Sequence, residues 1–103
     1  MTIENVLLTT SETTILTGTA NGLANVCLWF CNTSAANVTI TVYIRKPSQS
    51  AGDINTVIKE LSLVSKDTFL LNLEKMLMQE NAILSAVAST TGVVSVSASY
   101  LSF

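Results

Sequence analysis

The stretch VTITVYIR, residues Val38–Arg45, alternates apolar and polar side chains along its length. Successive side chains of an extended chain point to opposite sides, so this pattern predicts a β-strand with one buried face. The apolar face would carry Val38, Ile40, Val42 and Ile44, and the polar face Thr39, Thr41, Tyr43 and Arg45. The strand is expected to end at Lys46-Pro47, because proline has no backbone donor for a sheet.

The stretch before it, VCLWFC (Val26–Cys31), is apolar at every position and predicts a second strand. The connection CNTSAAN is rich in Asn, Thr and Ser, whose side chains bond to nearby backbone groups. We therefore expect a short hairpin loop between the two strands. Longer loops are expected at Thr17–Asn25, which contains two glycines, and in KPSQSAGDIN.

Further strands are predicted on both sides of this pair. They are Val6–Leu8, Thr13–Thr17, Val57–Val64, Asp67–Leu73, Lys75–Met78, Ala82–Ala88 and Val93–Phe103. About eight short strands, with turn signals roughly every 8–12 residues, are typical of an antiparallel all-β sandwich. We expect a jelly-roll or Ig-like β-sandwich. The 103 residues are expected to form a single domain, because half of them would be too few for a second core. Residues 1–12 are expected to form an N-terminal arm or an edge strand.

One segment permits a second interpretation. LLNLEKMLMQENAILSAVA (Leu70–Ala88) is rich in Leu, Met, Glu, Lys and Ala, which favour helices, and its leucines have tolerable helical spacing. Its flanks are strand-like, however, and QEN has the character of a hairpin turn. Strands are therefore the preferred interpretation.

Composition excludes several classes of function. Charged residues make up 12% of the chain, about half the usual share, and the net charge is −2. Nucleic acid is not an expected partner, because Arg45-Lys46 are the only adjacent cations. A membrane is not expected either, because no apolar run approaches about 18 residues. The first twelve residues contain two glutamates and no cationic segment, unlike a signal peptide, so folding in a reducing cytoplasm is expected.

The chain offers little reactive chemistry. It has no histidine, which is the usual general base near neutral pH, and its carboxylates are scattered beside lysines. Cys27 and Cys31 lack partners for a metal site. In a strand they would lie about 13 Å apart, beyond disulfide range. We expect them to be small buried hydrophobic residues. No catalytic residue, cofactor or metal is predicted, and the chain is not expected to be an enzyme.

The second face of VCLWFC needs a cover that the sequence does not identify. As a strand, it places Val26, Leu28 and Phe30 on one face, and Cys27, Trp29 and Cys31 on the other. Three explanations stay open: a loop, Thr17–Asn25 or Lys46–Asn55, covers this face; the face contacts another copy of the protein; or Trp29 points into the core and leaves Leu28 and Phe30 outside. As a contact, Trp29 could bury about 200 Å², a gross gain of about 5 kcal/mol.

Uncharged polar strand faces point toward assembly. The predicted faces Thr39, Thr41, Tyr43 and Ser95, Ser97, Ser99 carry almost no charge, whereas monomeric sheet proteins usually protect such surfaces with Lys or Glu. We therefore expect a homo-oligomer. The candidate partner interface consists of Cys27, Trp29, Cys31, Thr39, Thr41 and Tyr43.

The order of motifs resembles the small β-sandwich structural proteins of tailed bacteriophages. Cys31-Asn32 before small polar residues, the alternating strand Val38–Ile44, and Ile83–Ser89 with Ala86 and Ala88 carry the resemblance. A terminal alternating strand completes it, and it covers most of residues 23–103. Glu80-Asn81 stands where that pattern often has Gly-Asp.

The resemblance implies a virion component that assembles in the host cytoplasm. A compact single domain fits a capsid decoration or cement protein best, with a tail, neck or fibre component as the alternative. A carbohydrate- or receptor-binding module is a third expectation. The implied partners are further copies of the chain, in trimers for many such proteins, and the major capsid or tail proteins.

Overall fold

The computed structural model describes residues 2–102, and the side chains of residues 3–73 and 77–102. Within that range the regular structure is β-strand, apart from one short 3-10 turn, so the all-β prediction is confirmed and Leu70–Ala88 is not helical. The elements are β1 (Thr2–Leu7), β2 (Thr13–Thr17), β3 (Leu23–Asn32), β4 (Val38–Arg45), η1 (Asp53–Asn55), β5 (Thr56–Leu63), β6 (Thr68–Met78), β7 (Ile83–Ala88) and β8 (Val94–Ser102).

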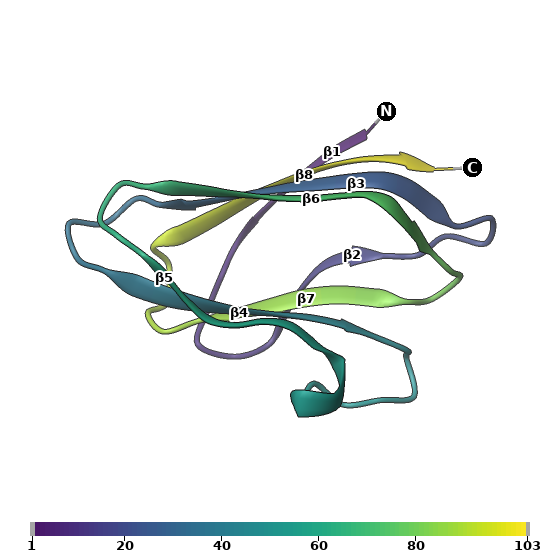
Figure 1. Ribbon diagram of the computed structural model, residues 1–103, viewed down its shortest axis with the longest axis horizontal. Coiled ribbons are helices and arrows are strands. Elements are labelled where there is room, and N and C mark those ends of the chain that lie inside the picture. The colour runs from purple at the N-terminus through teal and green to yellow at the C-terminus, as the bar shows by residue number, and fades with distance from the viewer. Residues whose placement is uncertain (1, 103) are drawn as a thin grey trace.

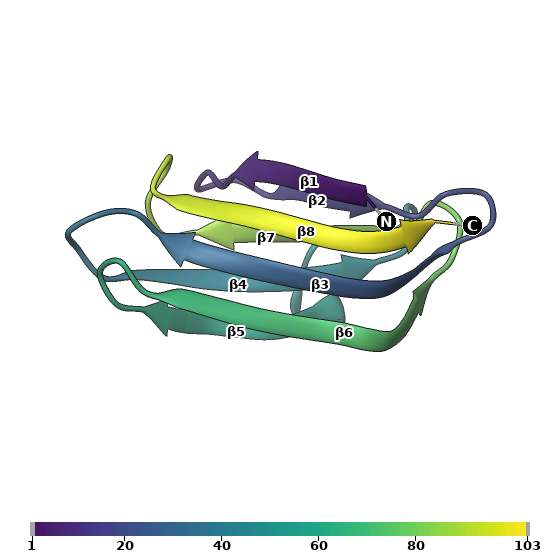
Figure 2. The same cartoon turned by 90° about the horizontal axis from the view of Figure 1, so that it is seen from above.

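The strands form two stacked antiparallel sheets (Figure 1). The first sheet has the order β1-β8-β3-β6 and the second has the order β2-β7-β4-β5. Seen from above, β1 lies over β2, β8 over β7, β3 over β4, and β6 over β5 (Figure 2). The predicted antiparallel β-sandwich is therefore confirmed.

The connections differ from the predicted hairpins. CNTSAAN joins β3 of the first sheet to β4 of the second, so it crosses between the sheets instead of closing a hairpin. The QEN turn likewise joins β6 to β7 across the sandwich. Alternation shows that a strand has one buried face, but it carries no information about which sheet the strand joins. Among the described strands, β4 and β5 are the only sequence neighbours that pair.

Several strand boundaries also differ from prediction. β2 and β4 have the predicted bounds, whereas β3 begins at Leu23, inside the predicted loop Thr17–Asn25. Asn25 has a positive φ of 53° at a β-bulge, which places both Leu23 and Val26 on the buried side and hides the alternation. β6 is one strand where two were predicted. Residues 2–7 form an edge strand paired with β8, and Phe103 lies outside the described residues.

The core fills the space between the sheets. Leu28 and Phe30 of β3 are fully buried, as are Ile40 and Val42 of β4. The ring of Phe30 also packs against that of Phe69 on β6, with centroids 6.4 Å apart. The predicted inner face of β4 is thus confirmed, and of the orientations left open for β3 the structure has the one with Val26, Leu28 and Phe30 inside. The other faces of both strands lie on the outer surfaces of the sandwich.

Asn32 forms a polar anchor at the end of β3. It is fully buried, and its amide nitrogen donates to the carbonyl oxygens of Ala36 (2.7 Å), Leu63 (3.0 Å) and Val64 (3.2 Å). Its side-chain oxygen accepts hydrogen bonds from the backbone N–H (3.0 Å) and the hydroxyl (2.8 Å) of Ser34. One side chain therefore ties the β3–β4 crossing to the end of β5.

Candidate interaction surface

The outer surface of the first sheet is built by three rows of side chains that run across its four strands. Residues opposite one another in an antiparallel sheet share a face, so the strand register defines the rows. The rows are Leu7, Ser95, Cys31 and Thr68; Asn5, Ser97, Trp29 and Leu70; and Ile3, Ser99, Cys27 and Asn72. We call these twelve side chains the first-sheet face.

None of the twelve side chains carries a charge. Four of them are large, apolar and exposed: Ile3 by 69%, Leu7 by 54%, Leu70 by 50% and Trp29 by 40%. Polar members of the face bond to one another, since the Ser97 hydroxyl donates to Asn5 Oδ1 (3.0 Å) and the Cys27 thiol to Asn72 Oδ1 (3.4 Å). Removal of such a face from water costs little desolvation free energy, because none of its side chains is charged. This property is typical of surfaces that bind partners.

Trp29 lies in the middle row, between Ser97 of β8 and Leu70 of β6. Its inward orientation is excluded, because Leu28 and Phe30 occupy the core. The explanation that a loop covers this face is also wrong, because Trp29 remains 40% exposed. Contact with another copy stays a prediction. The exposed part of the ring is about 100 Å², worth about 2.5 kcal/mol, or half the sequence-based figure.

The two cysteines flank Trp29 on the same face. Both are free thiols and half-buried, so the prediction that they are buried hydrophobic residues is only partly correct. Their neighbours across the strands are Thr68, Asn72 and two serines, which leave part of each thiol accessible.

The six predicted interface residues do not form one surface. Cys27, Trp29 and Cys31 lie on the outer side of the first sheet, whereas Thr39, Thr41 and Tyr43 lie on the outer side of the second. The Thr41 side chain also has a local partner, since its Oγ1 accepts a hydrogen bond from the backbone N–H of Glu60 (3.1 Å). The structure groups Trp29 instead with the seryl face of β8 and with Ile3, Leu7 and Leu70, which were not predicted as site residues.

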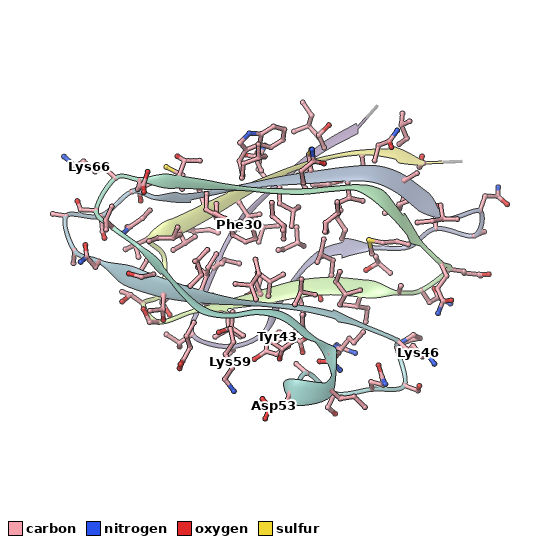
Figure 3. All side chains as sticks on the ribbon, viewed as in Figure 1. Phe30, Tyr43, Lys46, Asp53, Lys59 and Lys66 are labelled. Carbon is pink, nitrogen blue, oxygen red and sulfur yellow. The ribbon has the colours of Figure 1, made fainter. Side chains whose placement is uncertain are left out.

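The outer side of the second sheet is charged, contrary to the sequence-based expectation. Lys59 and Asp53 form an exposed ion pair at 2.9 Å, and Figure 3 shows both beside Tyr43. Arg45 Nε donates to Glu12 Oε2 at 2.8 Å. Arg45 belongs to β4 and was visible in its alternation, whereas Lys59, Asp53 and Glu12 come from β5, η1 and the β1–β2 loop and were not. They protect this face against association, which leaves the first-sheet face as the stronger candidate.

The Glu12 carboxylate should make stability depend on pH. Hydrogen bonds from Arg45 and from the buried hydroxyl of Ser85 (2.5 Å) hold the pKa of Glu12 below its usual value, against a smaller opposing effect of burial. A lowered folded-state pKa adds stability above the unfolded-state value of about 4.3, and this is lost as pH falls through the folded-state pKa. Urea unfolding at pH 7, 5 and 3 should show a steeper loss of stability for wild type than for Glu12→Gln.

Asp53→Asn is the matched control for this experiment. Its ion pair with Lys59 is exposed, with side chains 90% and 62% accessible, and exposed pairs contribute little. The Asp53→Asn profile should therefore follow that of wild type. Parallel profiles for wild type and Glu12→Gln would contradict the assigned role of Glu12.

The described residues contain no cluster of three or more His, Cys, Asp or Glu side chains suited to a metal ion. Within residues 2–102, no helix has the length and apolar character needed to cross a membrane. The first-sheet face is thus the feature with the clearest capacity for recognition. Comparisons of the chain with protein-family models, with curated proteins and with solved structures give no match, so its function must be argued from its own residues.

Proposed function

We propose that this chain is a virion structural protein that acts as a capsid decoration or cement subunit through its first-sheet face. The observation that supports this most is the chemistry of that face, where Ile3, Leu7, Trp29 and Leu70 are exposed among uncharged polar side chains. Burial of this face against a neighbour would desolvate apolar atoms without desolvating a charge on it.

The strand order supports the jelly-roll form of the sandwich. An eight-stranded jelly roll can be described as a folded antiparallel ribbon in which strands 1 and 8, 2 and 7, 3 and 6, and 4 and 5 pair. All four of these pairings occur here. An Ig-like sandwich would instead place its first, second, fifth and fourth strands in one sheet. Jelly rolls occur in viral capsid and lectin domains, which agrees with the proposed role.

The proposed mechanism is additive contact. A patch three rows deep on four strands is small beside the roughly 1,600 Å² of a standard protein interface, so one such contact would be weak. Many copies on one shell would each add the binding energy of such a contact. Because the subunit would bind the assembled capsid and not its separated parts, binding would shift the equilibrium toward the assembled form. The partners would be further copies of this chain, with a trimer as one arrangement, and a major capsid protein. The chain would reside in the virion after assembly in the host cytoplasm.

A tail, neck or fibre position is the alternative within the virion. The same face would then contact a tail protein, and copy number would separate the two locations. Quantitative mass spectrometry of purified particles should find on the order of hundreds of copies for a decoration protein, against about six or twelve for a tail or neck component. Absence from purified particles would contradict both.

Replacement of Trp29 by lysine tests the role of the face. Wild type should sediment as a discrete oligomer or bind saturably to assembled shells, and Trp29→Lys should weaken this association at least about tenfold, because it removes an apolar anchor and adds a charge at the centre of the contact. Analytical ultracentrifugation over a concentration series measures the change. Tyr43→Lys places the same charge on the opposite side of the sandwich and should leave association unchanged.

A monomeric wild type with no affinity for capsids or tails would contradict the proposal. Glycan binding by such a monomer, abolished in Trp29→Ala, would instead support the carbohydrate-binding alternative. That alternative rests on the half-exposed indole of Trp29 beside the hydrogen-bonding side chains of Asn5 and Ser97.

A further inference from the structure

At one end of the sandwich the β4–β5 loop approaches the β6–β7 turn (Figure 1). Between these segments lies an open pocket, a surface cavity of about 290 Å³. Its apolar lining is formed by Ile44, Ile54, Leu77, Met78 and Ala82. We call this cavity the end pocket, and the proposed assembly role of the first-sheet face does not use it.

The end pocket combines a buried floor with exposed walls. Met78 and Ala82 are 2% and 5% exposed, whereas Ile54 on η1 is 84% exposed and Leu77 at the end of β6 is 65% exposed. Ile54 is the most exposed of the large apolar side chains described. An aliphatic group that enters the pocket would contact the floor and cover both walls, and the apolar area removed from water would come mainly from Ile54 and Leu77.

The cationic side chains that line the pocket indicate which kind of apolar ligand it would bind best. Arg45 and Lys46 contribute to the pocket, and none of its lining residues is acidic. The Arg45 guanidinium already forms an ion pair with Glu12 and donates a hydrogen bond to the carbonyl oxygen of Gln49 (2.6 Å). Lys46, which projects at the same end of the molecule in Figure 3, has no ion-pair partner among the described side chains. The pocket therefore offers an uncompensated ammonium group beside an apolar cavity.

The volume of the pocket restricts the ligand further. About 290 Å³ lies at the lower limit of ligand pockets and holds about one branched side chain, while the open mouth of the pocket leaves the attached backbone in solvent. A C-terminal residue carries its side chain and its carboxylate on the same carbon, so both groups reach a small site together. We propose that the end pocket binds the C-terminal residue of a partner polypeptide, with a branched aliphatic side chain in the cavity and the α-carboxylate against Lys46.

N-acetyl-leucine provides the minimal probe, because it carries an isobutyl group and a carboxylate. Titration into the labelled full chain, followed by amide chemical shifts, should give saturable changes at Lys46, Ile54, Leu77 and Ala82. A Kd of about 1 mM is expected for a ligand of this size. N-acetyl-leucinamide, without the charge, and N-acetyl-alanine, without the branched side chain, should each bind at least about tenfold more weakly.

Three variants test the residues. Lys46→Gln should weaken binding about tenfold and Ile54→Ser by a similar factor, and both change exposed loop positions, so the fold should be retained. Lys59→Gln removes a cation of the neighbouring strand β5 that does not line the pocket, and should leave binding unchanged. No saturable shift at tens of millimolar, equal binding of the amide, or an equal effect of Lys59→Gln would overturn the proposal.

A peptide that ends in leucine tests the source of the ligand. The free-acid form should bind at least as tightly as N-acetyl-leucine, and the C-terminal amide should bind at least about tenfold more weakly. Binding of N-acetyl-leucine but not of the peptide would overturn a polypeptide partner. None of these outcomes bears on the first-sheet face, whose test is association in Trp29→Lys.

Discussion

Replacement of Asn32 by alanine is expected to lower the free energy of unfolding by about 3–5 kcal/mol. The Asn32 side chain is fully buried and donates to three carbonyl oxygens, of which that of Leu63 is also in a buried residue. Alanine would leave the Leu63 carbonyl without this donor and the Ser34 N–H without its acceptor, whereas the carbonyl oxygens of Ala36 and Val64 keep the Ser34 hydroxyl (3.0 Å) and the Asp67 N–H (3.1 Å). A buried polar group that loses its partner costs about 1–3 kcal/mol, and the void left by the removed side chain adds to this loss.

Urea denaturation followed by circular dichroism measures this effect. Asn37→Ala is the matched control, because Asn37 lies in the same crossing but is exposed, and its side chain accepts one hydrogen bond, from the Ser65 N–H (3.1 Å). The control should lose less than about 1 kcal/mol. Equal losses in the two variants would show that Asn32 is not the anchor of the crossing.

Replacement of Gly18 by alanine is expected to cost about 3 kcal/mol, for a steric reason. A Cβ atom at this position would lie 1.9 Å from the carbonyl oxygen of Gln79 and 2.9 Å from its carbonyl carbon. Gly18 cannot move away freely, because its N–H donates to the Ala82 carbonyl (2.8 Å) and its own carbonyl accepts from the Asn81 N–H (2.9 Å). The end of β2 and the β6–β7 turn would have to separate, and two hydrogen bonds would be strained.

Gly52→Ala is the control for this substitution. No atom lies within 4 Å of a Cβ built at Gly52, and its φ of −176° is an extended conformation open to any residue. Alanine there should be neutral, or should stabilise by up to about 1 kcal/mol through the unfolded state. Thermal melts of the two variants should differ clearly, and a Gly18→Ala protein as stable as wild type would show that the turn has room to adjust.

The sequence predicted strands well where one face is buried and the other is polar. β4 has the predicted bounds for this reason. β2 also has the predicted bounds, although a bulge places both Ile15 and Leu16 in the core. The strand boundaries failed where a bulge changes the phase, as at Asn25. Assignment of strands to sheets also failed, because pairs such as β1–β8 join residues that are far apart in the chain, and no local pattern records them.

The candidate site was predictable only in part. The apolar second face of VCLWFC correctly identified Trp29 as unusual, but its neighbours depend on the pairing of β3 with β6 and β8. The exposure of Leu70 could not be predicted, because β6 is apolar on both faces near this residue. Phe69 and Leu71 on either side of it pack against the core. The end pocket could not be foreseen either, because it exists only where two loops from different parts of the chain meet.

The pairing pattern also bears on how fast the chain can fold. Among the described strand pairs, only β4 and β5 are neighbours in the sequence. Every other pair joins segments that are far apart in the chain, so its formation costs the entropy of closing a long loop. Such high contact order places refolding in roughly the millisecond-to-second range and leaves unpaired strand edges exposed meanwhile. A chain with so few charges has little repulsion to keep those intermediates apart, so refolding yield should fall as protein concentration rises.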